Sequence, residues 1–212
     1  MSYTIYGDPG SGAFSTEAAL AEAGAEYSFR TISLEKNEQT RPEFLAINPS
    51  GKMPALTLPG GEIMTESGAI LLTVAERFAD AGLLPLPTSL ARAQAVRWIL
   101  YMASEVYPMV EISDYPERFV PKGKEAEALR ETAKQRIRAR LLVLEENVAG
   151  PWLLPTGFSA ADIYIAMFTR WRNSLGADWL AAGHIPKILA LADAVSQRPK
   201  IAPVWKRHFP RG

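Results

Sequence analysis

Two short motifs in the first third of the chain constrain its fold and chemistry most. The first begins with Asn48–Gly51, an Asn-Pro-Ser-Gly run that predicts a tight turn, and leads through Met53-Pro54 into a short apolar strand. Pro54 cannot donate a backbone hydrogen bond, and it holds Met53 in an extended conformation. A cis Met53–Pro54 bond, which a turn-to-strand junction allows, leaves an exposed edge able to pair with an extended peptide.

The second motif is Glu66-Ser67, which stands immediately before an apolar pattern typical of a helix. A carboxylate, a hydroxyl and the free N–H groups of a helix N-terminus suit a ligand that bears both an amine and a carboxylate. Each motif alone is ordinary, because Asn-Pro-Ser-Gly usually makes only a turn and Glu-Ser commonly starts a helix. The apolar positions of the pattern are Ile70, Leu71, Val74, Ala75 and Phe78.

Together, at this spacing, the two motifs resemble the glutathione site of the glutathione S-transferase family. In that family the residue before a cis-proline pairs its backbone with the cysteinyl part of glutathione, and a Glu/Gln-Ser pair holds the γ-glutamyl end. The resemblance implies that Met53, Pro54, Glu66 and Ser67 bind glutathione as a co-substrate. Lys52 matches a lysine that some classes use on the tripeptide. The resemblance extends along nearly the whole chain.

Composition excludes several other classes of protein. Lys plus Arg number 23 and Asp plus Glu number 23, so the formal charge is zero and neither nucleic acid nor an anionic membrane is an expected partner. The chain has no cysteine, so any sulfur chemistry requires a thiol from outside. Two histidines, His184 and His208, are too few for a metal cluster, and no metal is expected. Without a signal peptide or a membrane-spanning run, a cytoplasmic location is expected.

The N-terminal part alternates strands and helices. Strand, helix and strand patterns in succession predict a βαβ unit, and a hairpin and a helix complete it. The predicted elements are Tyr3–Tyr6, Ala13–Ala23, Tyr27–Ile32, the hairpin Ala55–Leu58 with Glu62–Met64, and a helix from Glu66 to about Ala81. They predict a thioredoxin-like α/β domain over residues 1–81, and this is also the fold that the resemblance implies.

Residues 82–87, with two prolines and a glycine, predict a linker, and residues 88–212 read as an all-helical domain. One long helix is expected from Thr88 to about Tyr107, where Pro108 should kink or end it, and another over Lys122–Val148. Ser159–Asp162 is a capping box, expected to start a buried helix without doing chemistry. The family carries such a box at this point. The last clear helix is expected over Ile185–Ser196, before a proline-rich basic tail. The resemblance also implies a homodimer.

Family members activate the glutathione thiol with a hydroxyl in the loop after the first strand. The need is physical, because a free thiol with a pKa of about 8.5 is only about 3% thiolate at pH 7. Lowering that pKa by about 2 units requires roughly 2.7 kcal/mol of preferential thiolate stabilisation. A hydroxyl, backbone N–H groups and the N-terminus of the Ala13–Ala23 helix could supply it together.

Three hydroxyls are candidates for this role. Ser11 follows a proline-glycine pair, as the catalytic serine does in insect-type serine enzymes, and is the preferred candidate. Ser15 ends a Gly-Ala-Phe-Ser stretch that resembles the Gly-Ala-Cys-Ser of the bacterial beta class, with Phe14 where that class has cysteine. Tyr6 ends the first strand, roughly where the tyrosine classes place theirs.

The second substrate is expected between the two domains, against the loop at residues 7–12 and the long helix. Tyr101, Met102, Glu105 and Tyr107 are candidate liners, although such a stripe at helical spacing more often belongs to a core. The function expected from the resemblance is transfer of glutathione to a small, apolar electrophile. Two alternatives stay open: a glutathione-dependent disulfide reductase or peroxidase, and a non-catalytic binding or regulatory protein with the same fold.

Overall fold

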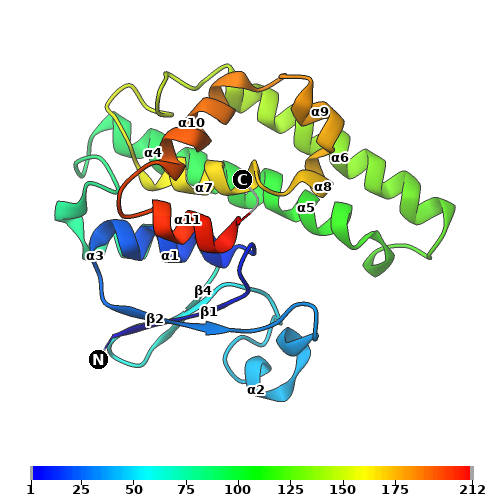
Figure 1. Ribbon diagram of the computed structural model, residues 1–212, viewed down its shortest axis with the longest axis horizontal. Coiled ribbons are helices and arrows are strands. Elements are labelled where there is room, and N and C mark those ends of the chain that lie inside the picture. The colour runs from blue at the N-terminus through cyan, green and yellow to red at the C-terminus, as the bar shows by residue number, and fades with distance from the viewer. Residues whose placement is uncertain (1, 211–212) are drawn as a thin grey trace.

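The N-terminal domain is built on a four-stranded sheet. The computed structural model describes residues 2–210, in which the strands are β1 (Tyr3–Gly7), β2 (Tyr27–Thr31), β3 (Ala55–Thr57) and β4 (Ile63–Thr65). Their order is β2-β1-β3-β4; β1 is parallel to β2 and antiparallel to β3, and β3 is antiparallel to β4. Helices α1 (Ala13–Ala23) and α3 (Ser67–Arg77) pack side by side above the sheet (Figure 1). The thioredoxin-like domain is thus confirmed.

Strand β1 sets the direction in which the following loop leaves the sheet. Tyr3, Ile5 and Gly7 are buried, whereas the alternate residues, Thr4 and Tyr6, are only partly buried because successive side chains point to opposite faces. At Gly7, a Cβ would collide with the Cβ of Ala13, so glycine lets the end of the strand lie directly against the first turn of α1. The loop at 8–12 is therefore held at the mouth of that helix.

The C-terminal part is helical and lies over α1 and α3 (Figure 1). Helix α7 is its centre, because all nine of its residues are buried. The helices of this part are α4 (Leu90–Tyr101), α5 (Tyr107–Asp114), α6 (Lys124–Glu145), α7 (Ala160–Phe168), α8 (Arg172–Leu175), α9 (Ala177–Ala181), α10 (Pro186–Ser196) and α11 (Ala202–His208). The short α2 (Pro42–Leu45) belongs to the first domain. The expected all-helical domain is confirmed. The predicted end of the first domain at residue 81, the linker over residues 82–87 and the start of the second domain at residue 88 stay predictions.

The capping box at the start of α7 is present. The backbone N–H of Ser159 donates to the Asp162 carboxylate at 2.7 Å, and that of Leu153 donates to its other oxygen at 2.7 Å. Burial raises the pKa of Asp162 to about 6. The carboxylate thus ties the preceding loop to the central helix, in agreement with the structural role expected for it.

Pro108 does not end the long helix. A π-helical segment over Met102–Val106 joins α4 to α5, so the helical path runs from Leu90 to Asp114. Pro108 stands in the first turn of α5, where a proline is tolerated because the missing N–H has no regular helical partner.

The proline-rich, basic tail after α10 contains a helix that the sequence analysis did not predict. Residues Ala202–His208 form α11, which packs along α1 (Figure 1). Pro203 lies in the first helical turn, where its fixed φ favours the helix. Phe14 of α1 meets Trp205 and His208 edge to face, with ring centroids 5.3 and 5.5 Å apart. These aromatic contacts stabilise a helix whose local sequence gave little sign of it.

Within residues 2–210, no helix has the length and apolar character needed to cross a bilayer.

Candidate functional site

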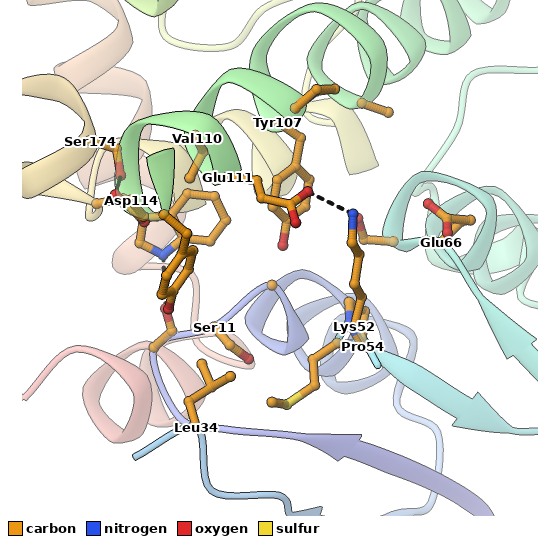
Figure 2. A pocket seen from close by; sticks show the side chains of 18 of the residues that line it. Ser11, Leu34, Lys52, Pro54, Glu66, Tyr107, Val110, Glu111, Asp114 and Ser174 are labelled. Atoms are coloured by element: carbon orange, nitrogen blue, oxygen red, sulfur yellow. Dashed lines mark hydrogen bonds and ion pairs between the residues drawn. The ribbon is translucent and has the colours of Figure 1, made fainter. Parts of the chain in front are cut away.

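A pocket of about 1020 Å³ lies between the sheet domain and the helical domain. Figure 2 shows Glu66 and Asp114 at opposite ends of this pocket, with Ser11 and Tyr107 between them. The structure brings to one wall all the residues expected to contact glutathione. These are Ser11, Lys52, Met53, Pro54, Glu66 and Ser67.

Ser11 lines the pocket and its hydroxyl is already polarised. Its Oγ accepts hydrogen bonds from the backbone N–H of Ala13, at 3.2 Å, and of Asp8, at 3.3 Å. Both bonds use the oxygen lone pairs, so the hydroxyl proton stays free to be donated to a ligand atom. Backbone donors at the first turn of α1 also favour negative charge near this oxygen.

Ser15 and Tyr6 do not line the pocket. Ser15 is fully buried and donates its hydroxyl proton to the carbonyl of Gly12 at 2.9 Å, one helical turn back. Tyr6 alternates away from the buried side of β1, and its hydroxyl accepts a long bond, of 3.5 Å, from Thr57. Of the three candidate hydroxyls, the structure therefore places only Ser11 at the site.

The loop that carries Ser11 is fixed by the helical domain. The Gly10 N–H donates to Nδ1 of His208 at 3.0 Å, and the Gly10 carbonyl accepts from Nε1 of Trp171 at 2.8 Å. Because Nδ1 is an acceptor, Nε2 carries the proton and donates to the buried Glu17 carboxylate at 2.8 Å. Burial, and then the Arg207 charge, lower the pKa of His208 to about 4, so the ring is neutral at pH 7.

The first motif has the geometry expected for pairing with a peptide. The Met53–Pro54 bond is cis, and the Met53 backbone makes no hydrogen bond within residues 2–210. The Asn48 side chain shapes the preceding turn, accepting from the Ser50 N–H at 3.1 Å and donating to the Lys52 carbonyl at 2.6 Å. At Met53, which lines the pocket, a backbone donor and acceptor are thus left without a partner within residues 2–210.

The second motif sits at the start of α3. Glu66 has φ 64° and ψ 105°, a conformation that is uncommon for a residue other than glycine and is found mostly at functional sites. Its carboxylate forms no ion pair within the described residues. The hydroxyl of Ser67 lies 2.7 Å from that of Tyr164 on α7. A carboxylate and a hydroxyl thus stand together at a helix N-terminus.

Lys52 reaches across the pocket to the helical domain. Its Nζ lies 2.7 Å from the Glu111 carboxylate, the contact drawn as a dashed line in Figure 2. The other oxygen of Glu111 pairs with Arg118 at 3.2 Å. In the free protein Glu111 therefore holds the cation that was expected to contact the tripeptide.

Of the four residues expected on the second-substrate wall, only Tyr107 lines the pocket. Tyr101 donates to the carbonyl of Arg140, Glu105 pairs with that residue's guanidinium, and Met102 is fully buried. The side that lines the pocket instead carries Leu100, Ala103, Tyr107 and Val110. The lining residues recur at regular helical spacing, i, i+3, i+7 and i+10, so the prediction missed them by choosing the neighbouring face of the helix.

Tyr107 contributes a hydroxyl close to the Ser11 loop. A Cβ at Gly12 would collide with this hydroxyl, so glycine is required for the close approach. Burial raises the pKa of Tyr107, so its hydroxyl stays protonated and can donate. It makes no hydrogen bond within residues 2–210, although it faces the same space as Ser11 (Figure 2).

Sequence reasoning gave no functional role to Tyr164, Trp171 or His208. Each acts through a partner more than ninety positions away, namely Ser67 for Tyr164 and Gly10 for the other two. No local pattern could have paired them. Metal ligation finds no support in the described residues, where no group of three or more His, Cys, Asp or Glu side chains could hold an ion.

Comparisons with known proteins agree with this architecture. Residues 1–76 match the family model for the glutathione S-transferase N-terminal domain, and residues 117–207 match a model for the C-terminal domain. The uncharacterized GST-like protein YncG of Escherichia coli K12 is 32% identical over 206 residues, covering 96% of this chain and 97% of its own.

Two further proteins bear on the chemistry. The disulfide-bond oxidoreductase YfcG of E. coli K12 is 32% identical over 167 residues, covering 74% of this chain and 75% of its own. A crystal structure of a Sulfitobacter glutathione transferase homolog, with bound glutathione, superposes with a TM-score of 0.88 at 30% identity. It covers 98% of this chain and 99% of that one.

Proposed function

Because this chain belongs to the glutathione S-transferase family, we propose that its pocket binds glutathione and activates the thiol for attack on a small electrophile. The observation that carries the proposal is the geometry of Ser11. Its hydroxyl accepts two backbone N–H bonds and keeps its proton for a ligand, at the edge of a pocket that also holds the peptide-binding motifs.

Each part of glutathione has a matching group on the sheet-domain wall. The γ-glutamyl ammonium is assigned to the unpaired Glu66 carboxylate, and its carboxylate to the Ser67 hydroxyl and the N-terminus of α3. The cysteinyl backbone pairs with the free N–H and C=O of Met53. Lys52 is assigned to the glycyl carboxylate, for which it must leave Glu111. This arrangement directs the thiol towards Ser11.

Thiol activation follows from charge and hydrogen bonding. A thiolate at Ser11 accepts the hydroxyl proton and lies near the N-terminus of α1. A second donor, the protonated Tyr107 hydroxyl, faces the same space. A charge-assisted hydrogen bond contributes about 1.5–3 kcal/mol, which covers the roughly 2.7 kcal/mol needed to lower the thiol pKa by about 2 units. Ser15 stays a candidate only if ligand binding breaks its bond to Gly12.

The runner-up is a glutathione-dependent disulfide reductase. The similarity to the oxidoreductase YfcG favours it, and so does the absence of cysteine, which leaves bound glutathione as the only redox sulfur. In that reaction the glutathione thiolate attacks a disulfide, forming a mixed disulfide and releasing a thiol. A second glutathione thiolate then resolves the mixed disulfide, giving glutathione disulfide and the second thiol. A peroxidase and a non-catalytic binding protein are further alternatives.

One experiment separates these functions. The purified protein is titrated with glutathione by calorimetry and then assayed with matched panels of electrophiles, disulfides and peroxides. Transfer activity that exceeds disulfide reduction supports the proposal. Reduction without transfer assigns the protein to the runner-up. Binding without turnover indicates a regulatory protein, and absence of glutathione binding rejects the assignment of the pocket.

We also propose that the protein forms a homodimer and acts in the cytoplasm. Large apolar side chains are exposed at the start of α4 and on β4, with Leu90 76% and Ile63 45% accessible. A second copy that covers these side chains would remove apolar surface from water. Light scattering on wild type and Leu90→Glu tests this, because the charge should yield monomers if this face is the interface.

A further inference from the structure

The wall of the pocket opposite the glutathione residues is rich in arginine. Its arginines are Arg118, Arg130, Arg170 and Arg172. Arg118 pairs with Glu111 and lies 4.0 Å from the centre of the Tyr115 ring, and Arg170 lies over two aromatic rings of α11 and the residue after it. Within residues 2–210, by contrast, the guanidinium groups of Arg130 and Arg172 form neither an ion pair nor a hydrogen bond.

These two arginines also line a second cavity, of about 480 Å³, which adjoins the main pocket. Lys134 and Arg138 line it too, and Asp178 is the single carboxylate among its described lining residues. Lys134 and Arg138 are already engaged, the first with Glu131 at 2.9 Å and the second with the Leu175 carbonyl at 2.8 Å. The cavity therefore has positive charge in excess, and the two arginines without partners stand at its junction with the main pocket.

We propose that the electrophile used by this protein carries a carboxylate, which Arg130 and Arg172 bind at the junction of the two cavities. The proposal rests on the transferase function above and specifies its substrate class. Guanidinium groups bind carboxylates through paired N–H donors, and two arginines from different helices, α6 and α8, can hold one carboxylate from two sides. The reacting carbon then lies towards Ser11 and Tyr107.

Asp114 provides an internal check on this assignment. It lies at the end of the pocket away from Glu66 (Figure 2), where its carboxylate accepts a bond from Ser174 at 2.8 Å. Burial raises the pKa of Asp114, and the charges of Arg130 and Lys134 act in the opposite direction. An incoming carboxylate would be repelled by Asp114 and attracted by the arginines. Asp114→Asn should therefore strengthen the binding of an anionic electrophile, whereas loss of the arginines weakens it.

The test compares two substrates of nearly equal shape, a chlorodinitrobenzoate and the matching chlorodinitrobenzamide. The variants are Arg130→Gln, Arg172→Gln and their combination. Arg136→Gln, an exposed residue of α6 that lines neither cavity, is the matched control. We expect kcat/KM for the benzoate to fall about tenfold for each arginine removed, with the benzamide and the control changed less than about twofold.

Several outcomes would overturn the proposal. Equal losses for benzoate and benzamide, or no loss for either, would show that the arginines do not read the carboxylate. A parallel loss of glutathione affinity in calorimetry would assign them to glutathione itself. A loss confined to turnover of glutathione disulfide would assign them to the carboxylates of a second glutathione.

A binding measurement separates this proposal from the proposed function. Dinitrobenzoate, which lacks a leaving group, is titrated into the protein with glutathione present. If wild type turns over neither substrate, the transferase function fails. Arginine-dependent binding of dinitrobenzoate would still support the carboxylate site in that case, and equal binding by wild type and the double variant would reject it.

Discussion

The hydroxyl oxygen of Ser67 lies 2.7 Å from the hydroxyl oxygen of Tyr164. Ser67 opens α3 in the sheet domain and Tyr164 is buried in α7, so the bond joins the ligand-facing helix to the centre of the helical domain. Burial raises the pKa of Tyr164, which therefore stays protonated. When Tyr164 donates, the Ser67 proton is left for a ligand carboxylate.

Tyr164→Phe should weaken glutathione binding while the protein stays folded. Without its partner, the Ser67 hydroxyl loses both its orientation and its polarisation, and we expect a loss of about 0.5–1.5 kcal/mol in binding. Calorimetric titration measures the change. Tyr101→Phe is the matched control, because it removes a hydroxyl that bonds the Arg140 carbonyl outside the pocket. Equal glutathione affinities for wild type and Tyr164→Phe would show that the bond between Ser67 and Tyr164 does not contribute to binding.

Glu66→Ala should weaken glutathione binding more than Tyr164→Phe does. The carboxylate is assigned to the γ-glutamyl ammonium, and losing a charge-assisted hydrogen bond weakens binding by about 1.5–3 kcal/mol. Glu66→Gln keeps the shape and one acceptor but not the charge, so its affinity should lie between those of wild type and Glu66→Ala. Unchanged affinity in a folded Glu66→Ala protein would remove this residue from the site.

Glu111→Gln should leave glutathione bound as tightly as in wild type, or more tightly. The substitution releases Lys52 from its ion pair, so that its ammonium can reach the glycyl carboxylate without breaking a bond. Lys52→Met, in contrast, should weaken binding and make it less sensitive to salt. The pair itself is exposed and adds at most about 1 kcal/mol to stability. Weaker binding by folded Glu111→Gln would contradict the role given to Lys52.

Asp162→Ala should lower the free energy of unfolding by roughly 0.5–2 kcal/mol or more, because the capping box and the Leu153 N–H both lose their acceptor. Denaturant titration measures the loss. The glutathione affinity of the folded fraction should be nearly unchanged, since Asp162 does not line the pocket. A variant of full stability that is inactive would show that Asp162 takes part in the chemistry.

The stability that depends on His208 should change with pH. Its pKa is about 4 in the folded protein, below the ordinary value of 6.5, so the unfolded state binds more protons between these values. The free energy of unfolding therefore falls as pH drops from about 6.5 to about 4. Asp8, Glu17 and Arg207 are the charged groups nearby. His208→Gln should remove this contribution. The difference in the free energy of unfolding between this variant and wild type should therefore become smaller at low pH.

Local sequence predicted what local physics decides. The Asn48 turn, the helix that follows Glu66 and the Asp162 capping box were all visible in short segments, and the turn-to-strand junction allowed the cis Met53–Pro54 bond. The pairing of Ser67 with Tyr164 was not visible, because it depends on the packing of two domains. The same reason applies to α11, whose stability comes from aromatic contacts with Phe14 rather than from its own sequence.

The second-substrate wall shows a different limit. A regular helical period chose Tyr101, Met102 and Glu105, whereas the pocket is lined by Leu100, Ala103 and Tyr107. Both sets recur at helical spacing, so periodicity alone does not tell which face of the helix lines the pocket. Sequence reasoning gave no role to Arg130 or Arg172, because their common cavity forms from separate helices.

The central claim is that Ser11 activates the thiol of bound glutathione, and the thiolate absorbance of the complex against pH tests it most directly. Wild type should titrate about 2 units below the free value of about 8.5. Ser11→Ala should move the midpoint back towards the free value with little change in glutathione affinity, while Ser15→Ala and Tyr6→Phe titrate like wild type. A midpoint that Ser11→Ala leaves unmoved, and that Ser15→Ala shifts, would contradict the claim and pass the role to Ser15.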